Sequence, residues 1–241
     1  RSRRQRQMCI RDRFYRSLTE TEQQHVISAY TFELSKCYET PIRQRAVDVL
    51  ARVDRGLADA VAEGLGLQVS ADAPAEVGSV DTSAALSQLG KTYPVDGRKV
   101  AILADDTTPA EAIQPAVQAI VDAGMTPLVT ATTGGTLSAD DSEGKDIPVS
   151  RTYTAARSIE FDAAIVISLP DTPETNTLIE ELTQHFKAIA VLEDVKPADG
   201  QHALRKLVDD TPAGVEFVSD AKAGVDALVP LMENHRVWER A

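Results

Sequence analysis

A pair of acidic residues beside a predicted strand is the first candidate for chemistry in this sequence. Asp105-Asp106 follows directly after the apolar run Val100–Ala104. Paired carboxylates at a strand end can hold Mg²⁺ beside an aspartate that accepts a phosphoryl group. The apolar run Ala163–Ser168 would have to supply that acceptor at its end, where Ser168 stands instead. We therefore do not expect phosphoryl transfer to a carboxylate here.

A nucleophile on a sharp strand-to-helix turn is the second candidate, because such a turn exposes a Cys or Ser for attack on a carbonyl. The matching turn, Ala190–Asp194, contains no thiol or hydroxyl. His185 and His202 fall on predicted helices without a carboxylate–His–nucleophile pattern, so we expect surface histidines. Gly134-Gly135 lacks the glycine spacing and the lysine of a phosphate-binding loop. We expect no catalytic residue and no metal site.

Cysteine count and charge exclude further classes. Cys9 and Cys37 are too few for a disulfide framework or a structural zinc site, which indicates a reducing, cytoplasmic location. The net charge of −12 combines +6 over residues 1–16 with −18 over the remainder. The net negative charge of residues 17–241 disfavours nucleic acid or an anionic membrane as a partner, because their phosphates would be repelled. No apolar run reaches the roughly 18–20 residues that span a bilayer.

From residue 98 onward, short apolar runs alternate with amphipathic helices. The expected strands are Val100–Ala104, Leu128–Ala131, Ala163–Ser168, Ala188–Leu192 and Val215–Val218, and the expected helices are Pro109–Ala123, one from Thr172, and Ala221–Trp238. Residues 134–150 are expected to form a small hairpin. This order predicts an α/β fold with a parallel sheet covered on both faces, whose ligand site would lie at the carboxyl ends of the strands.

The preceding part of the chain predicts two helices, over residues 19–38 and 40–65. Thr19 and Glu22 have the spacing of a capping box, and Pro41 suits a first helical turn. Both helices carry long apolar stripes. Because about 50 residues make a marginal independent core, we expect this all-α segment to be an appendage of a larger body.

Two segments do not fit either folded part. Residues 1–13 are rich in arginine and contradict the charge of everything downstream, so we interpret them as a foreign or disordered extension. Residues 68–97 are rich in Ala, Ser, Pro, Gly and Asp and are expected to form an interdomain linker. The expected organisation is therefore extension 1–13, helical segment 14–67, linker 68–97 and α/β domain 98–241.

Ordered motifs in both folded parts resemble one family. Phe14–Thr19, Glu22–His25 and Tyr30–Lys36 resemble the helical end of the haem catalase core, and Arg98–Leu103, Phe161–Val166 and His235–Trp238 resemble the additional C-terminal domain of large-subunit catalases. The resemblance covers residues 14–241 in the order expected for that family.

The resemblance implies a parent protein that disproportionates hydrogen peroxide to water and oxygen on haem, as a homotetramer. It places the distal His and Asn and the proximal Tyr ligand upstream, so this chain alone is expected to be inactive and to bind no haem. Its expected partners are the missing core and the other subunits. Arg11 and Tyr15 have the Arg-x-x-x-Tyr spacing of the proximal ligand, but the residues that follow do not continue that motif.

The same C-terminal domain is similar to the flavodoxin-like, class I glutamine-amidotransferase-like superfamily. The resemblance places the nucleophile position of active members on Leu192 and the acidic partner on Glu111, so the domain is expected to be structural. An alternative hypothesis is an independent amidotransferase-like enzyme acting on small carbonyl or amide substrates, for which Cys37 would be the thiol to probe. A third is a pure interaction module.

Overall fold

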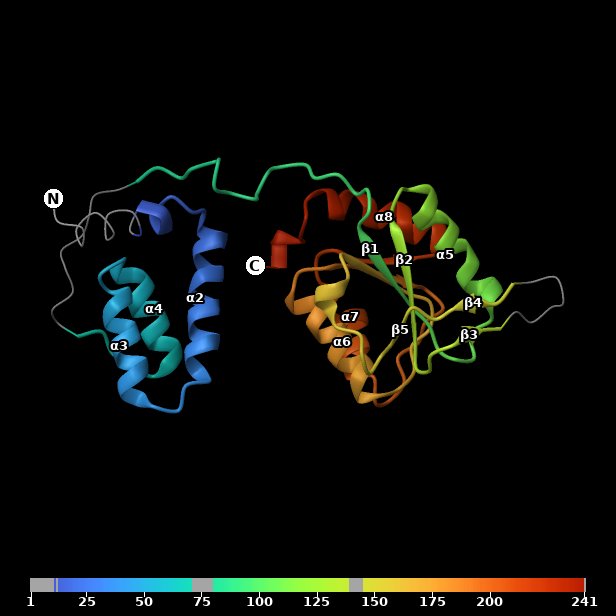
Figure 1. The fold of residues 1–241 in the computed structure, drawn as a ribbon, viewed down its shortest axis with the longest axis horizontal. Helices are drawn as coiled ribbons and strands as arrows, with labels where there is room; N and C mark the ends of the chain where they lie inside the picture. The colour runs from blue at the N-terminus through green and yellow to red at the C-terminus, as the bar shows by residue number, and fades with distance from the viewer. Residues whose placement is uncertain (1–10, 12, 71–79, 139–144, 241) are drawn as a thin grey trace. The chain divides into compact units, whose positions relative to one another are not determined.

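The computed structural model describes residue 11 and residues 13–70, 80–138 and 145–240. These residues form two compact units that divide between Gln88 and Leu89 (Figure 1). The interpretation of residues 1–13 as an extension falls outside the described residues, except for Arg11 and Arg13. Among the helices of the described residues, none is long and apolar enough to cross a membrane.

Parts of the expected linker, residues 68–97, hydrogen-bond to each unit. The Ser83 amide donates to the Ser17 carbonyl at 2.8 Å within the helical unit. The Tyr93 amide donates to the Glu233 carbonyl at 2.8 Å within the α/β unit.

Helices α2 (Glu20–Ser35), α3 (Thr40–Leu50) and α4 (Arg55–Leu65) pack together in the first unit. The prediction of one helix over residues 40–65, and so of a two-helix segment, is therefore wrong. The helix ends before Asp54, and the Asp54 side chain caps the next helix: its Oδ1 accepts the Leu57 amide at 3.0 Å. Its Oδ2 accepts Arg16 Nε at 2.8 Å. Such a cap satisfies a free amide of the next helix and so starts a new one.

The start of α2 is as predicted, but its end is not. Thr19 and Glu22 form the capping box, with the Thr19 amide donating to Glu22 Oε2 at 3.0 Å. The helix ends at Ser35 rather than at residue 38. Arg43 Nη2 donates to the Ser35 carbonyl at 3.1 Å, so this late carbonyl is satisfied by a side chain instead of a further turn.

The helical unit buries only part of its apolar side chains. Its core consists of Tyr15, Leu18, Val47, Leu50, Ala51, Leu57, Ala58, Val61 and Ala62. No residue of α2 is buried, and Tyr30 and Phe32 are 44% and 62% exposed. Ile42 and Val49, expected on the apolar stripe of the second helix, are also exposed. The unit thus leaves several large apolar side chains exposed.

The second unit is built on a six-stranded sheet of order β5-β2-β1-β6-β7-β8, in which every neighbouring pair is parallel. The strands are β1 (Lys99–Leu103), β2 (Thr126–Ala131), β5 (Arg151–Thr152), β6 (Ala163–Val166), β7 (Ala188–Leu192) and β8 (Val215–Val218). The predicted hairpin is present as antiparallel β3 (Thr136–Leu137) and β4 (Ile147–Pro148). Apart from the short edge strand β5, the order is that of flavodoxin-like sheets.

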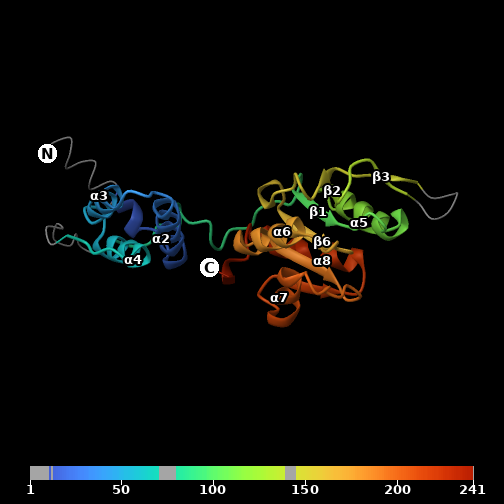
Figure 2. The same ribbon diagram turned by 90° about the horizontal axis from the view of Figure 1, so that it is seen from below.

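Helices cover both faces of this sheet, which confirms the predicted α/β class (Figure 1 and Figure 2). One face packs against α5 (Ala110–Asp122) and α8 (Ala221–Glu233), and the other against α6 (Pro173–Gln184) and α7 (His202–Asp210). Strands β1 and β6 are buried almost throughout. This is the pattern of parallel strands shielded on two sides.

The last helix is shorter than predicted. α8 ends at Glu233 instead of Trp238, because His235 adopts a left-handed backbone with φ 68°. The chain then turns back, and the Val237 amide donates to the Phe186 carbonyl at 2.9 Å. A 3₁₀ turn, η2 (Trp238–Arg240), follows.

Two glycines with the same backbone conformation provide a stability test. Gly214 (φ 70°) and Gly97 (φ 72°) both require the left-handed region, but an added Cβ would meet Val237 at Gly214 and open space at Gly97. We predict that Gly97→Ala costs ~1–2 kcal/mol of backbone strain. Gly214→Ala should cost a further ~1–3 kcal/mol from overpacking. Urea unfolding followed by Trp238 fluorescence measures both, and equal losses would contradict the packing against Val237.

Candidate functional site

The carboxyl ends of β1 and β6 form the switch point of the sheet, where α/β folds of this type bind ligands. Ser168 occupies this point. Its Oγ accepts the Asp105 amide at 2.8 Å and lies 2.5 Å from Thr108 Oγ1. The structure thus brings Asp105 and Ser168 together, but through the backbone amide of Asp105 and not through its carboxylate.

The carboxylates of Asp105 and Asp106 accept hydrogen bonds from two different loops. Asp105 Oδ1 accepts the amide and the hydroxyl of Thr107 at 2.8 and 2.7 Å. Asp106 Oδ1 accepts the amides of Thr132 and Thr133 at 2.8 and 3.1 Å. Within the described residues, no three His, Cys, Asp or Glu side chains are grouped so as to hold a metal ion. These acids therefore cap loops, and the geometry does not support phosphoryl transfer.

The position that the superfamily resemblance assigns to a nucleophile lies at the end of β7. Leu192 is half-buried, and the following Glu193 amide donates to the Val218 carbonyl at 3.0 Å. Glu111 lies exposed in the first turn of α5. Both residues belong to elements at the carboxyl end of the sheet. That they are remnants of a Cys–acid site stays a prediction.

A serine, a histidine and a glutamate that the sequence did not connect lie together beside α6. Ser158 Oγ lies 2.5 Å from His185 Nδ1, and the Ser158 amide donates to Glu181 Oε2 at 3.1 Å. His185 is thus on the surface as predicted, but it does have a hydroxyl partner. Only the four-residue spacing of Glu181 and His185 on one helix could have suggested the grouping.

The exposure of Ser158 decides what this grouping can do. The Ser158 side chain is 0% exposed, so a substrate carbonyl cannot reach its oxygen. Its contacts hold the 3₁₀ turn η1 (Ser158–Glu160) against α6. We conclude that the grouping stabilises the fold and is not a catalytic dyad.

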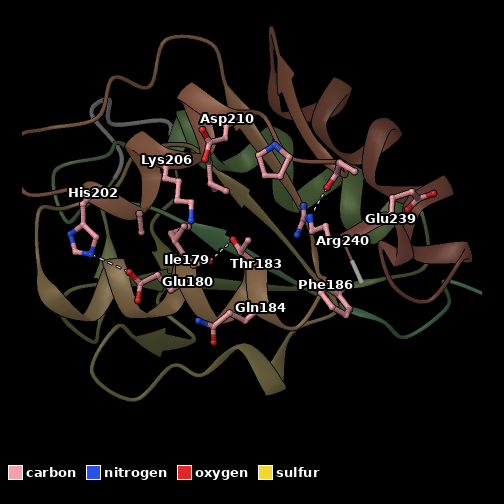
Figure 3. A pocket seen from close by; sticks show the side chains of 14 residues that line it. Ile179, Glu180, Thr183, Gln184, Phe186, His202, Lys206, Asp210, Glu239 and Arg240 are labelled. Atoms are coloured by element: carbon pink, nitrogen blue, oxygen red, sulfur yellow. Dashed lines mark hydrogen bonds and ion pairs between the residues drawn. The ribbon is translucent and has the colours of Figure 1, made fainter. Parts of the chain in front are cut away.

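A pocket of about 690 Å³ lies between α6, α7 and the C-terminal turn (Figure 3). Ile179 and Leu207 contribute apolar surface to it, and the His202–Glu180 pair, 3.1 Å apart, lies along its side. Its lining hydroxyl, Thr183, donates to the Ile179 carbonyl at 2.8 Å. No Ser or Cys is among the lining residues, so the pocket offers room for a ligand but no strong nucleophile.

Cys37 is not at the sequence position expected for the thiol. It follows α2 in the helical unit and is half-buried, whereas the elbow position belongs to the α/β unit. The alternative of an amidotransferase-like enzyme therefore has no nucleophile at its expected position.

These features define a flavodoxin-like α/β domain joined to a helical segment. Residues 96–241 match the family model described as the C-terminal domain found in long catalases, and residues 12–65 match the model described as catalase-related immune-responsive. The chain belongs to the family of C-terminal domains of long catalases, which confirms the resemblance found in the sequence.

Individual relatives agree with this assignment. The chain is 33% identical over 239 residues to Catalase HPII of Pseudomonas putida, covering 94% of this chain and 32% of that protein. It is 28% identical over 238 residues to Catalase-2 of Bacillus subtilis, covering 94% of this chain and 33% of that protein. The chain thus spans about a third of the length of the curated relatives that it matches.

Removal of the buried hydroxyl tests the structural role of Ser158. Ser158→Ala should lower the free energy of unfolding by ~1–2 kcal/mol, because the fully buried Ser158 hydroxyl and its contact with His185 Nδ1 are lost. The control Ser219→Ala, at an exposed residue, should change it by less than ~0.5 kcal/mol. Urea unfolding measures the difference, and a fluorophosphonate probe should leave Ser158 unlabelled. Stoichiometric labelling at Ser158 would contradict its burial.

Proposed function

We propose that this chain is the C-terminal part of a catalase whose complete form disproportionates hydrogen peroxide to water and oxygen. The supporting observation is the pair of family matches, which lie in the order helical segment then α/β domain and leave most of each relative's length unaccounted for. In this proposal, residues 14–67 end the catalase core, residues 68–97 link the parts, and residues 98–241 form the added domain.

The described residues do not fit a haem. Catalases hold haem iron through a tyrosine, and a phenolate ligand requires that the phenol ionise. Burial, together with Asp54, raises the pKa of Tyr15, which is part of the helical core. Burial also raises the pKa of Tyr153, whose hydroxyl donates to the Ala104 carbonyl at 2.9 Å. We therefore derive no haem chemistry from Tyr15 or Tyr153 and infer that the haem belongs to the core upstream.

The exposed apolar surface of the helical unit supports a docking role. Tyr30 and Phe32 on α2, Tyr38 after it and Ile42 on α3 are between 43% and 96% exposed. Exposed apolar side chains of this size are buried when a partner packs over the helices that carry them. In the proposal, the catalase core covers this surface.

The α/β domain is then a structural element of a homotetramer. Leu192 cannot attack a carbonyl, and the buried Ser158 cannot meet a substrate, so no observation favours an independent hydrolytic function. The low cysteine content supports a cytoplasmic location for the whole protein.

Activity measurements on two lengths of the protein test this proposal. The purified chain mixed with haem and peroxide should evolve no oxygen and should show no Soret band of tyrosine-ligated haem. The protein expressed together with the coding sequence upstream of Phe14 should show both. Oxygen evolution by the chain alone, or a start codon directly before Phe14, would overturn the proposal.

A further inference from the structure

Three of the segments that carry the family resemblance converge at the amino edge of the sheet. Arg98 precedes β1, Asp162 precedes β6, and His235 and Arg236 follow α8. Lys187 precedes the neighbouring strand β7. The amino ends of parallel strands lie along one edge, so residues far apart in sequence meet there. We call Arg98, Lys187, His235 and Arg236 the basic cluster.

Direct contacts tie this cluster together. Arg98 Nη1 lies 3.5 Å from Asp162 Oδ1 and 3.4 Å from His235 Nδ1. The other Asp162 oxygen, Oδ2, accepts the Lys99 amide at 3.0 Å. Arg236 Nη1 donates to the His235 carbonyl at 2.7 Å. Asp162 is thus already engaged by a guanidinium and by a backbone amide.

Lys187 adds a nearly inaccessible ammonium group. It is 4% exposed, and its Nζ donates to the Phe161 carbonyl at 2.6 Å. An ammonium carries three donors, so a single hydrogen bond leaves capacity for further acceptors. Burial, with added repulsion from Arg236 and Arg98, lowers the pKa of Lys187 to about 8, although Asp162 opposes this.

The charges around the cluster do not balance. Burial lowers the pKa of His235 and the pKa of Arg236. The positive charge of Arg98 lowers both pKa values further, whereas the carboxylate of Asp162 raises both. Within the described part of the chain, the cations Arg98, Lys187 and Arg236 therefore share the carboxylate of Asp162, although the net charge of the whole chain is −12. Like charges in a partly desolvated site repel each other strongly, and an anion placed among them would relieve that repulsion.

We propose that the basic cluster binds a small oxyanion, a phosphate or a carboxylate, at the amino edge of the sheet. Arg236 is half-buried, and its hydrogen bonds within the described residues all involve Nη1, so the N–H groups on Nε and Nη2 remain for a ligand. Guanidinium groups suit the planar, paired acceptors of both anions, and Lys187 supplies a point charge. This site is independent of the proposed catalase function and lies at the opposite edge from the switch point.

The sole tryptophan gives this site its own reporter. Trp238 lies two residues from Arg236, and its Nε1 donates to the Asn234 carbonyl at 2.9 Å. The next turn is anchored to the cluster, because Arg240 Nη1 donates to the Lys187 carbonyl at 2.9 Å. An anion bound at Arg236 should therefore change the fluorescence of Trp238.

The test is a titration of the chain with sodium phosphate, and separately with sodium succinate, against sodium chloride at matched ionic strength. Trp238 fluorescence and calorimetry should show saturable binding of one anion per chain, and the stronger of the two anions identifies the class of ligand. The pKa of His235, followed by NMR, should rise on binding, because the anion offsets Arg98, Lys187 and Arg236.

Matched variants complete the experiment. Arg236→Gln should weaken anion binding at least tenfold, whereas Arg236→Lys should retain part of it and shows that the site still folds. Arg205→Gln removes an exposed arginine of α7 that pairs with Asp199 at 3.5 Å, and should leave binding unchanged. Equal responses to phosphate, succinate and chloride would overturn the proposal, as would equal losses in Arg236→Gln and Arg205→Gln.

Discussion

The burial of one parallel sheet on both faces is the constraint on which the α/β unit depends. Strands β1 and β6 have little accessible surface, so their side chains must be apolar and their backbone groups must pair with neighbouring strands. Polar chemistry is consequently restricted to the two edges where strands begin and end. Asp105 and Ser168 lie at the carboxyl edge, and Asp162 and Lys187 lie at the amino edge.

Polar groups are paired differently at the carboxyl ends and at the amino ends of the strands. At the carboxyl edge, the hydroxyl of Ser168 and the carboxylates of the acidic pair accept nearby amides, so donors and acceptors are matched within the loops. At the amino edge, the basic cluster has Asp162 as its one acidic neighbour among the residues that the structure describes. The carboxyl ends, where such folds commonly bind ligands, thus have these polar groups paired within the loops, while the described residues at the amino ends carry more basic side chains than acidic ones.

Much of this fold follows from local pattern. β7 and β8 have the predicted bounds, Ala188–Leu192 and Val215–Val218, because short runs of apolar residues specify buried strands well. The apolar pattern does not predict the end of α3 before Asp54, because apolar residues continue at helical spacing on both sides of that cap. The edge strand β5 has two residues and no pattern of its own. The contact of Ser158 with His185 spans 27 positions, and no local motif encodes such a contact.

The helical unit differs from the α/β unit because its helices do not enclose their own apolar surface, and α2 contains no buried residue. In the proposed complete protein, an upstream catalase core covers this surface. Amide hydrogen exchange of α2, compared between this chain and the protein that includes its upstream sequence, tests it most directly. Coverage predicts markedly slower exchange over Glu20–Ser35 in the longer protein, with unchanged rates in β6. Identical exchange of α2 in both proteins would contradict the claim.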